Sequence, residues 1–119
     1  MKQIKVSETT RLQLDWLVSK CVGDFAFYHD IEDGQRFLNL WTDSAFLHYS
    51  SNWANGGPII ELEGVALRPK GATWVAYAKG KLVDIVYPME GPTPLIAVCR
   101  CYVASKLGDV VEVPDELVQ

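Results

Sequence analysis

One stretch of the chain, residues 91–108, limits most strongly what the rest of it can fold into. Its sequence is GPTPLIAVCRCYVASKLG, and both ends carry helix signals. Thr93 can cap the free N–H groups of a first turn, and Pro94 suits the first helical position. Gly108 suits the left-handed residue that ends a helix.

At 100° per residue, this stretch has one wide apolar face, a second face of small residues and few polar positions. The apolar face comprises Leu95, Ile96, Cys99, Tyr102, Val103 and Leu107, and the small face comprises Ala97, Cys101, Ala104 and Ser105. A helix that is apolar nearly all round is buried. The sequence therefore predicts a central, buried helix at 93–107 that the rest of the protein surrounds.

The size and charge of the chain exclude several classes of protein. It has 119 residues, of which 49% are hydrophobic and 22% charged, and its formal net charge is −4. These values predict a single domain at 1–119, in which residues 113–119 form an acidic tail. Nucleic acid is not an expected partner, because nucleic-acid binders carry a basic field. With no apolar run of about 20 residues and no apolar signal core, we expect a cytoplasmic protein that does not bind membranes.

A first helix is predicted from a cap at Ser7, Thr9 or Thr10 to about residue 22, and its apolar residues form two opposite stripes. One stripe comprises Leu14, Leu17, Val18 and Cys21, and the other comprises Leu12 and Trp16. Such a helix is either sandwiched between other elements or exposes one stripe to a partner. The sandwiched arrangement is favoured. The alternative places Leu12 and Trp16 at a dimer or target interface, where tryptophan is enriched.

Short segments of alternating or β-branched residues predict about five antiparallel strands. Five segments carry this prediction: Phe25–Tyr28, Gln35–Trp41, Val65–Arg68, Ala72–Ala78 and Leu82–Tyr87. Lys2–Val6 and Val110–Val113 could each add a short strand. Residues 42–58 show no period and predict a structured aromatic loop, and residues 59–63 fit either an extended piece or a helical turn. Strands that occur in runs indicate an α+β fold. The expected architecture is two helices packed on an antiparallel sheet of short strands, with the C-terminal helix central and buried.

No pattern of catalytic or metal-ligating residues stands out. The two histidines, His29 and His48, have no metal-ligand spacing with another His, Cys or carboxylate. Nucleophile-elbow and zinc-protease motifs are absent. The three cysteines, Cys21, Cys99 and Cys101, are expected to be reduced thiols in the core. We therefore expect no enzyme activity, no metal and no cofactor.

The tetrapeptide Asn55-Gly-Gly-Pro, with Trp53 beside it, is the first candidate binding segment. Gly56 and Gly57 could expose backbone N–H groups to an anion. The favoured interpretation is a turn that needs positive φ, which the proline then closes. Trp53 could stack on a base or ring, although the favoured interpretation is a plug that anchors the loop over the core.

Arg100 is the only cation in the middle of the predicted buried helix. A buried guanidinium needs a carboxylate or several acceptors. The favoured interpretation is an ion pair with Glu61 or Glu63 that ties the preceding loop to the helix. The functional alternative is an arginine that lines a pocket and reaches a phosphate or carboxylate ligand, with Arg68 as a second cation.

Several segments together are specific enough to suggest a family. They are Leu14–Val18, Asn52–Glu61, Gly91–Ile96, Arg100–Asp109 and Val113–Leu117. With these segments the chain resembles the NinX-like family of small phage and prophage accessory proteins over most of its length. The resemblance implies a phage or prophage origin and a role inside the infected bacterium. It implies no catalytic residues.

The leading hypothesis is a non-enzymatic phage accessory protein that binds a host protein or assembles with itself as a homodimer. The alternative is a protein that binds a small anionic, nucleotide-like ligand. Its candidate ligand-binding residues are Trp53, Asn55, Gly56, Gly57, Glu61, Arg68 and Arg100. A third and weaker hypothesis is an enzyme that uses His48 or Glu61. A pocket where Trp53 and an unpaired Arg100 converge would favour the ligand, and a histidine beside a carboxylate would favour the enzyme.

Overall fold

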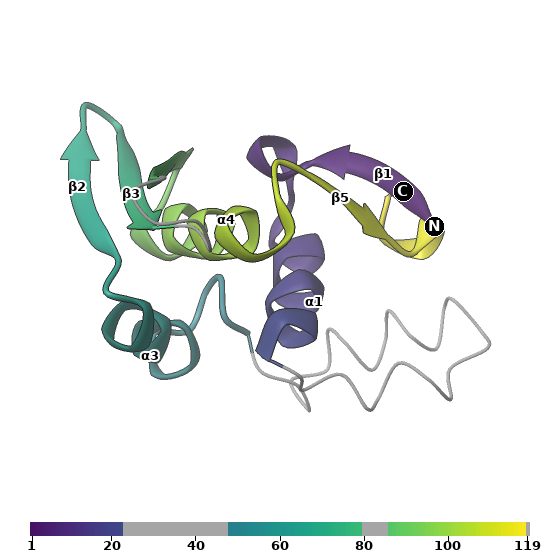
Figure 1. Ribbon diagram of the computed structural model, residues 1–119, viewed down its shortest axis with the longest axis horizontal. Helices are drawn as coiled ribbons and strands as arrows, with labels where there is room; N and C mark the ends of the chain where they lie inside the picture. Colours follow the sequence, from purple (N-terminus) through teal and green to yellow (C-terminus); the bar gives the residue numbers. More distant parts are fainter. Residues whose placement is uncertain (23–47, 80–85, 119) are drawn as a thin grey trace.

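The structure, a computed structural model, describes residues 1–22, 48–79 and 86–118 and has the α+β class that the sequence predicted (Figure 1). In chain order its elements are β1 (Lys2–Lys5), the 3-10 helix η1 (Val6–Glu8), α1 (Arg11–Val22), α3 (Trp53–Glu63), β2 (Ala66–Lys70), β3 (Thr73–Lys79), β4 (Val86–Gly91), α4 (Pro94–Leu107), β5 (Val110–Val113) and the 3-10 helix η3 (Asp115–Leu117). The described strands form two antiparallel sheets, in the orders β1–β5 and β2–β3–β4. The strands divide in this way because the two ends of the chain pair with each other and not with the middle strands.

Helix α4 is the buried centre of the molecule, as predicted. Thr93 Oγ1 accepts a hydrogen bond from the N–H of Ile96 at 3.2 Å, which caps the start of the helix. At its end, the N–H of Gly108 donates to the carbonyl of Ala104 at 2.9 Å, and Gly108 has a φ of 92°. Ten of the fourteen residues of α4 are buried. Figure 1 shows the helix between the β2–β3–β4 sheet and α1.

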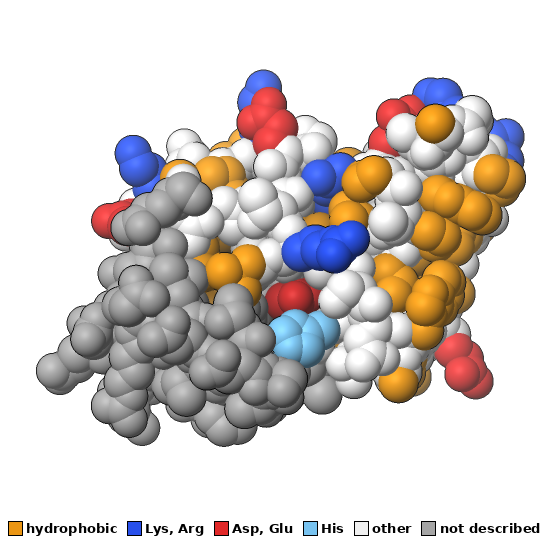
Figure 2. Space-filling view, turned by 180° about the vertical axis from the view of Figure 1, so that it is seen from behind, with side chains coloured by type: hydrophobic (Ala, Val, Ile, Leu, Met, Phe, Trp, Pro, Cys, Tyr) orange, Lys and Arg blue, Asp and Glu red, His pale blue; other side chains and the backbone are white. Residues whose placement is uncertain are grey.

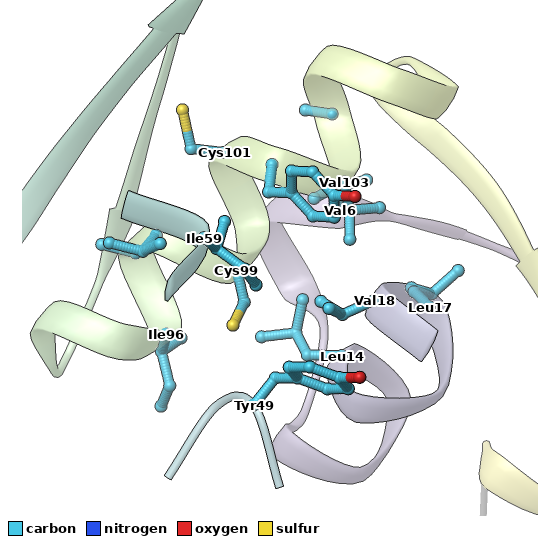
Figure 3. Packing of buried hydrophobic residues seen from close by; sticks show 14 of the residues in the cluster. Val6, Leu14, Leu17, Val18, Tyr49, Ile59, Ile96, Cys99, Cys101 and Val103 are labelled. Carbon is cyan, nitrogen blue, oxygen red and sulfur yellow. The ribbon is translucent and has the colours of Figure 1, made fainter. Parts of the chain in front are cut away.

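Helix α1 begins after Thr10 with a reciprocal cap. The N–H of Gln13 donates to Thr10 Oγ1 at 3.3 Å, and the N–H of Thr10 donates to Gln13 Oε1 at 2.9 Å. Both stripes of α1 are covered. Leu14 is 0% exposed and points into the central cluster (Figure 3), Trp16 is 5% exposed and Leu12 is partly buried. This burial fits the sandwiched arrangement and leaves Trp16 little surface for a partner.

The three-stranded sheet follows the predicted meander with shifted boundaries. β2 extends to Lys70 and β4 extends to Gly91, so Pro69 and Pro88 lie inside strands that were expected to end before them. Both prolines are tolerated because β2 and β4 are the outer strands of this sheet among the described residues, where a missing N–H can face away from the ladder. The strands predicted at 25–28 and 35–41, residues 82–85 of the strand predicted at 82–87, residues 42–47 of the predicted loop and His29 lie outside the described residues.

The last residues of the chain dock against α1. β5 pairs with β1, which places Val113 opposite Lys2. Leu117 is 5% exposed, and its carbonyl accepts a hydrogen bond from Gln13 Nε2 at 2.7 Å. Residues 113–118 are therefore not the solvated acidic tail that the sequence suggested, because Val113 and Leu117 place apolar anchors among the acidic residues.

Residues 53–63 form helix α3, although the sequence predicted a loop up to residue 58. Asn52 caps its start, with Oδ1 accepting a backbone N–H at 2.9 Å, and Gly64 ends it in the left-handed region with a φ of 62°. The Gly-Gly-Pro segment is helical, so the positive-φ turn predicted there was wrong. Residues 59–63, which fitted either an extended piece or a helical turn, belong to the same helix.

Gly56 has a packing role instead of a turn role. A Cβ atom at this position would lie 2.2 Å from the carbonyl oxygen of Tyr49 and 2.9 Å from Cδ2 of Leu95. Only a glycine therefore lets α3 approach the preceding turn and the start of α4 this closely. At Gly57, by contrast, the nearest atom to an added Cβ is Cε3 of Trp53 at 3.9 Å, an ordinary contact distance.

We expect Gly56→Ala to destabilise the protein by about 1–3 kcal/mol, the range for forcing extra atoms into a packed contact. Gly57→Ala is the matched control and should stabilise the protein by about 0.5–1 kcal/mol, because alanine favours a helix and its Cβ has room. Urea unfolding followed by circular dichroism measures both effects. If the two variants changed the free energy of unfolding equally, the close-packing role of Gly56 would be refuted.

Candidate functional site

The structure does not gather the predicted ligand-binding residues in one place. Trp53, Asn55, Gly56, Gly57 and Glu61 lie on α3, Arg68 lies on β2 and Arg100 lies on α4. Asn55 Oδ1 accepts the N–H of His48 at 3.0 Å, so Asn55 holds the turn that precedes the helix. Arg68 donates to the hydroxyl of Tyr77 at 2.9 Å, and its guanidinium lies 5.7 Å from the centre of the same ring. Asn55 and Arg68 thus each have structural contacts of their own, with different partners.

Arg100 is a structural link between α4 and two neighbouring segments. Its Nε and Nη2 donate to Thr9 Oγ1 at 3.3 Å and to the Thr9 carbonyl at 2.7 Å, and its Nη1 donates to the Glu90 carbonyl at 2.9 Å. Burial lowers the pKa of the guanidinium. The expected ion pair with Glu61 or Glu63 is not formed in the described part of the chain. Three other oxygens already surround the guanidinium, and Glu63 pairs with a lysine of α4 at 3.4 Å.

A pocket of about 220 Å³ opens where the starts of α1, α3 and α4 meet the turn at residues 48–52. Its walls are formed by Arg11, Ser50, Ser51, Trp53, Thr93, Pro94 and Leu95. Trp53 is 55% exposed, so its ring stands at the edge of the pocket and does not plug the core as expected. Arg100 is not among the lining residues, and Arg11 supplies the positive charge in its place. The pocket therefore combines one predicted residue with a cation that sequence reasoning did not single out.

Three hydrogen-bond donors at this pocket have no partner within the described part of the chain. They are the guanidinium of Arg11, the hydroxyl of Ser51 and the backbone N–H of Leu95. Pro94 has no backbone N–H. Thr93 satisfies the N–H groups of Ile96 and Ala97, because its Oγ1 accepts from Ile96 and its carbonyl accepts from Ala97 at 3.1 Å. The start of α4 therefore leaves one backbone donor uncommitted, on a residue that lines the same pocket as Arg11.

Beside the pocket lies an acid–histidine pair that the sequence analysis missed. Asp15 on α1 is 3% exposed, its Oδ1 accepts the N–H of Ser50 at 2.8 Å, and its Oδ2 lies 3.6 Å from Nδ1 of His48. Burial raises the pKa of Asp15, while the hydrogen bonds from Ser50 and the charge of His48 oppose this rise. Ser50 Oγ also donates to the carbonyl of Arg11 at 3.4 Å. These contacts fasten the turn at 48–52 to α1.

A carboxylate that faces an imidazole can orient it for proton transfer, and it can equally fasten a turn. The side chain of His48 is 28% exposed, and Figure 2 shows the described histidine at the surface beside an acidic side chain. Ser50 is 1% exposed, so its hydroxyl is not presented to a substrate. A sequence signal for the pair did exist: Asp15 stands between Leu14 and Trp16, where a carboxylate needs polar partners.

The buried thiols of α4 do not form a reactive centre. Burial raises the pKa of Cys101 to about 12 and likewise raises the pKa of Cys99, so both thiols stay protonated at neutral pH. Among the described residues, no group of three or more His, Cys, Asp or Glu side chains is arranged to hold a metal ion. No helix in the described ranges is both long and apolar enough to cross a membrane.

Replacing Arg100 with lysine keeps the positive charge but removes the planar group that serves three oxygens. We expect Arg100→Lys to destabilise the protein by about 1–3 kcal/mol, since each hydrogen bond from a charged donor contributes about 1.5–3 kcal/mol. Arg68→Lys on the exposed strand β2 is the control and should stay within about 0.5 kcal/mol of the wild type in urea unfolding. If Arg100→Lys lowered the free energy of unfolding no more than the control does, Arg100 would not act as a structural link between α4 and its neighbours.

Replacing Asp15 with asparagine should change how stability depends on pH. Asparagine keeps an acceptor for the Ser50 N–H but cannot ionise. Folding raises the pKa of Asp15 above its ordinary value of 3.8, so between these two values the native state binds more protons than the unfolded state. The wild type therefore loses stability as the pH rises through this window, and Asp15→Asn does not lose this contribution.

The measurement is urea unfolding of wild type and Asp15→Asn at several pH values from about 4 to about 7. We expect the free energy of unfolding of the variant, relative to the wild type, to increase across this range. Asp109→Asn, at an exposed position, is the control for the loss of one acidic side chain, and the trend of Asp15→Asn is judged against it. A relative stability of Asp15→Asn that falls or stays constant with pH would contradict the raised pKa.

Comparison with known families adds an independent finding to this geometry. A family model described as Bacteriophage P22, NinX matches residues 5–106 of the chain. The match runs from the end of β1 to the last turn of α4 and includes every residue that lines the pocket. No curated protein matches the chain. Because the family model covers most of the sequence and agrees with the resemblance seen in its motifs, the chain belongs to the NinX family of phage proteins.

Proposed function

We propose that this phage accessory protein acts in the cytoplasm of the infected bacterium by binding another protein, without catalysing a reaction. Membership of the NinX family supports the phage accessory role. The observation that carries the binding proposal is the outer side of α3. Figure 1 shows this helix at the periphery of the molecule, with α4 on one side only.

The outer side of α3 is a short apolar surface with one charge, which we call the α3 face. It consists of Ala54, Pro58, Glu61 and Leu62, which recur at helical spacing on one side. All four residues are exposed, and Leu62 is 83% exposed. Gly56 and Ile59 are the buried residues of the helix. Burying a leucine contributes roughly 1.5–3 kcal/mol, so Leu62 could anchor a partner that covers this face.

The charge on the α3 face favours a different protein over a second copy of this chain. A symmetric dimer through this face would bring two copies of Glu61 toward each other among apolar side chains, where like charges are costly. A partner with an apolar groove and a neighbouring Lys or Arg would instead satisfy both Leu62 and Glu61. We therefore commit to a separate phage or host protein with an apolar, locally basic surface.

The test places the photo-crosslinker p-benzoylphenylalanine at position 62 of the full chain inside the host bacterium. We expect irradiation to yield one dominant protein adduct, identified by mass spectrometry. The same crosslinker in place of Val110, which is 47% exposed on β5, is the matched control and should not capture that protein. Adding Glu61→Lys to the position-62 label should reduce the adduct by about tenfold or more, because it opposes the basic surface of the partner.

Two results would contradict the proposal of a separate protein partner. An adduct that consists of two copies of the chain, together with a dimer mass in light scattering, would show self-association instead. Capture of the same proteins from positions 62 and 110, unaffected by Glu61→Lys, would show only unspecific contact.

A further inference from the structure

We propose that the pocket at the start of α4 is a binding site for a nucleoside monophosphate, held by Arg11, Ser51 and Trp53. This inference goes beyond protein binding and uses none of the residues of the α3 face. The phosphate would lie against Arg11, Ser51 and the Leu95 N–H, and the base would stack on Trp53.

The phosphate end is built around an uncommitted arginine. Arg11 is the first residue of α1, and its exposed guanidinium forms no ion pair or hydrogen bond with any described residue. A guanidinium fork matches two phosphate oxygens at once, and arginine is the side chain that suits this geometry best. The hydroxyl of Ser51, on the turn beside it, adds a neutral donor.

The start of α4 adds a directed donor to the same wall. The helix has fourteen residues, so its aligned peptide dipoles give its first turn a positive partial charge. Thr93 already satisfies the N–H groups of Ile96 and Ala97, which leaves that of Leu95 uncommitted in the described structure. One cation, one hydroxyl and one backbone N–H match a single phosphate group and not a chain of three.

The ring end is Trp53. Trp53 is 55% exposed although the fold buries Trp16 to 5%, so a large apolar ring stays in water at the edge of the pocket. Asn52 caps α3 directly before it and fixes the position from which the ring projects. Bases stack on exposed aromatic rings with little dependence on sequence. The ring of Trp53 therefore supplies a stacking surface for the base, and the three donors supply the contacts to the phosphate.

The size and charge of the pocket fit a small, singly phosphorylated ligand. Its volume of about 220 Å³ equals roughly seven water molecules, enough for a phosphate and part of a sugar, with the base outside over Trp53. None of the residues that line the pocket carries a carboxylate. Asp15, whose carboxylate accepts from the lining residue Ser50, is itself 3% exposed. The exposed charge of the pocket is thus that of Arg11.

The experiment is isothermal titration calorimetry on the full chain, with the four nucleoside 5′-monophosphates, ribose 5-phosphate and adenosine as probes. We expect at least one monophosphate to bind with a dissociation constant below about 1 mM, and ribose 5-phosphate and adenosine to bind at least about fivefold more weakly. Arg11→Gln should weaken the monophosphate by about tenfold or more. Trp53→Leu should reduce it to the level of ribose 5-phosphate without changing the affinity for ribose 5-phosphate itself.

Arg68→Gln is the control variant, since this arginine lies on β2 away from the pocket, and its titrations should match the wild type. Circular dichroism melting checks that each variant folds, which is expected because Arg11 and Trp53 are exposed. Binding by none of the four monophosphates would overturn the inference. So would monophosphate binding that Arg11→Gln leaves unchanged, or ribose 5-phosphate binding as tight as that of the monophosphate. Crosslinking at position 62 does not involve this pocket, so the two proposals can fail separately.

Discussion

The burial of α4 is the constraint on which the rest of the structure depends. A helix with ten buried residues out of fourteen needs apolar neighbours on nearly every side. The β2–β3–β4 sheet covers one side and α1 and α3 cover others, so a chain of 119 residues commits most of its elements to this one task. The first turn of α4 cannot be covered in the same way, because its backbone N–H groups need polar partners. The pocket, which is lined by Arg11 and two serines beside apolar residues, lies at this end of the helix.

Capping residues in the sequence predicted the helix ends correctly where no loop-forming residues lie inside the helix. Thr93 and Gly108 bounded α4, and one of the three proposed caps, Thr10, begins α1. Helix α3 was missed although Asn52 and Gly64 marked its ends, because Gly-Gly-Pro in its interior is the pattern of a loop. What outweighs that local preference is tertiary contact. The glycine that weakens the helix is the residue that lets α3 pack closely against Tyr49 and α4.

The pocket was only partly predictable, because its residues come from three separate stretches of the sequence. The sequence indicated Trp53 as a candidate because an aromatic ring lies beside two glycines there. Arg11 and Asp15, by contrast, fitted the polar flanks of a predicted helix. Both residues become part of the site or its support because the turn at 48–52 packs on α1. No local sequence pattern predicts that contact. The partners of Arg100 were equally invisible in the sequence, since two of them are backbone carbonyls and any residue type can supply these. A sequence suggests carboxylates as the partners of an arginine, whereas Arg100 binds mainly to backbone carbonyls in the structure.

Hydrophobic burial brings α1, α3 and α4 together, but it is not directional and does not fix one turn relative to another. The contact between Asp15 and the N–H of Ser50 supplies that direction. A buried carboxylate costs free energy, and a hydrogen-bonded one is retained only where its partners offset that cost. Here the contact holds Ser51 and Trp53 next to the start of α4, while Arg11, four residues earlier on the same helix, stays uncommitted. One buried acid thus sets the geometry of a pocket whose own donors remain free for a ligand.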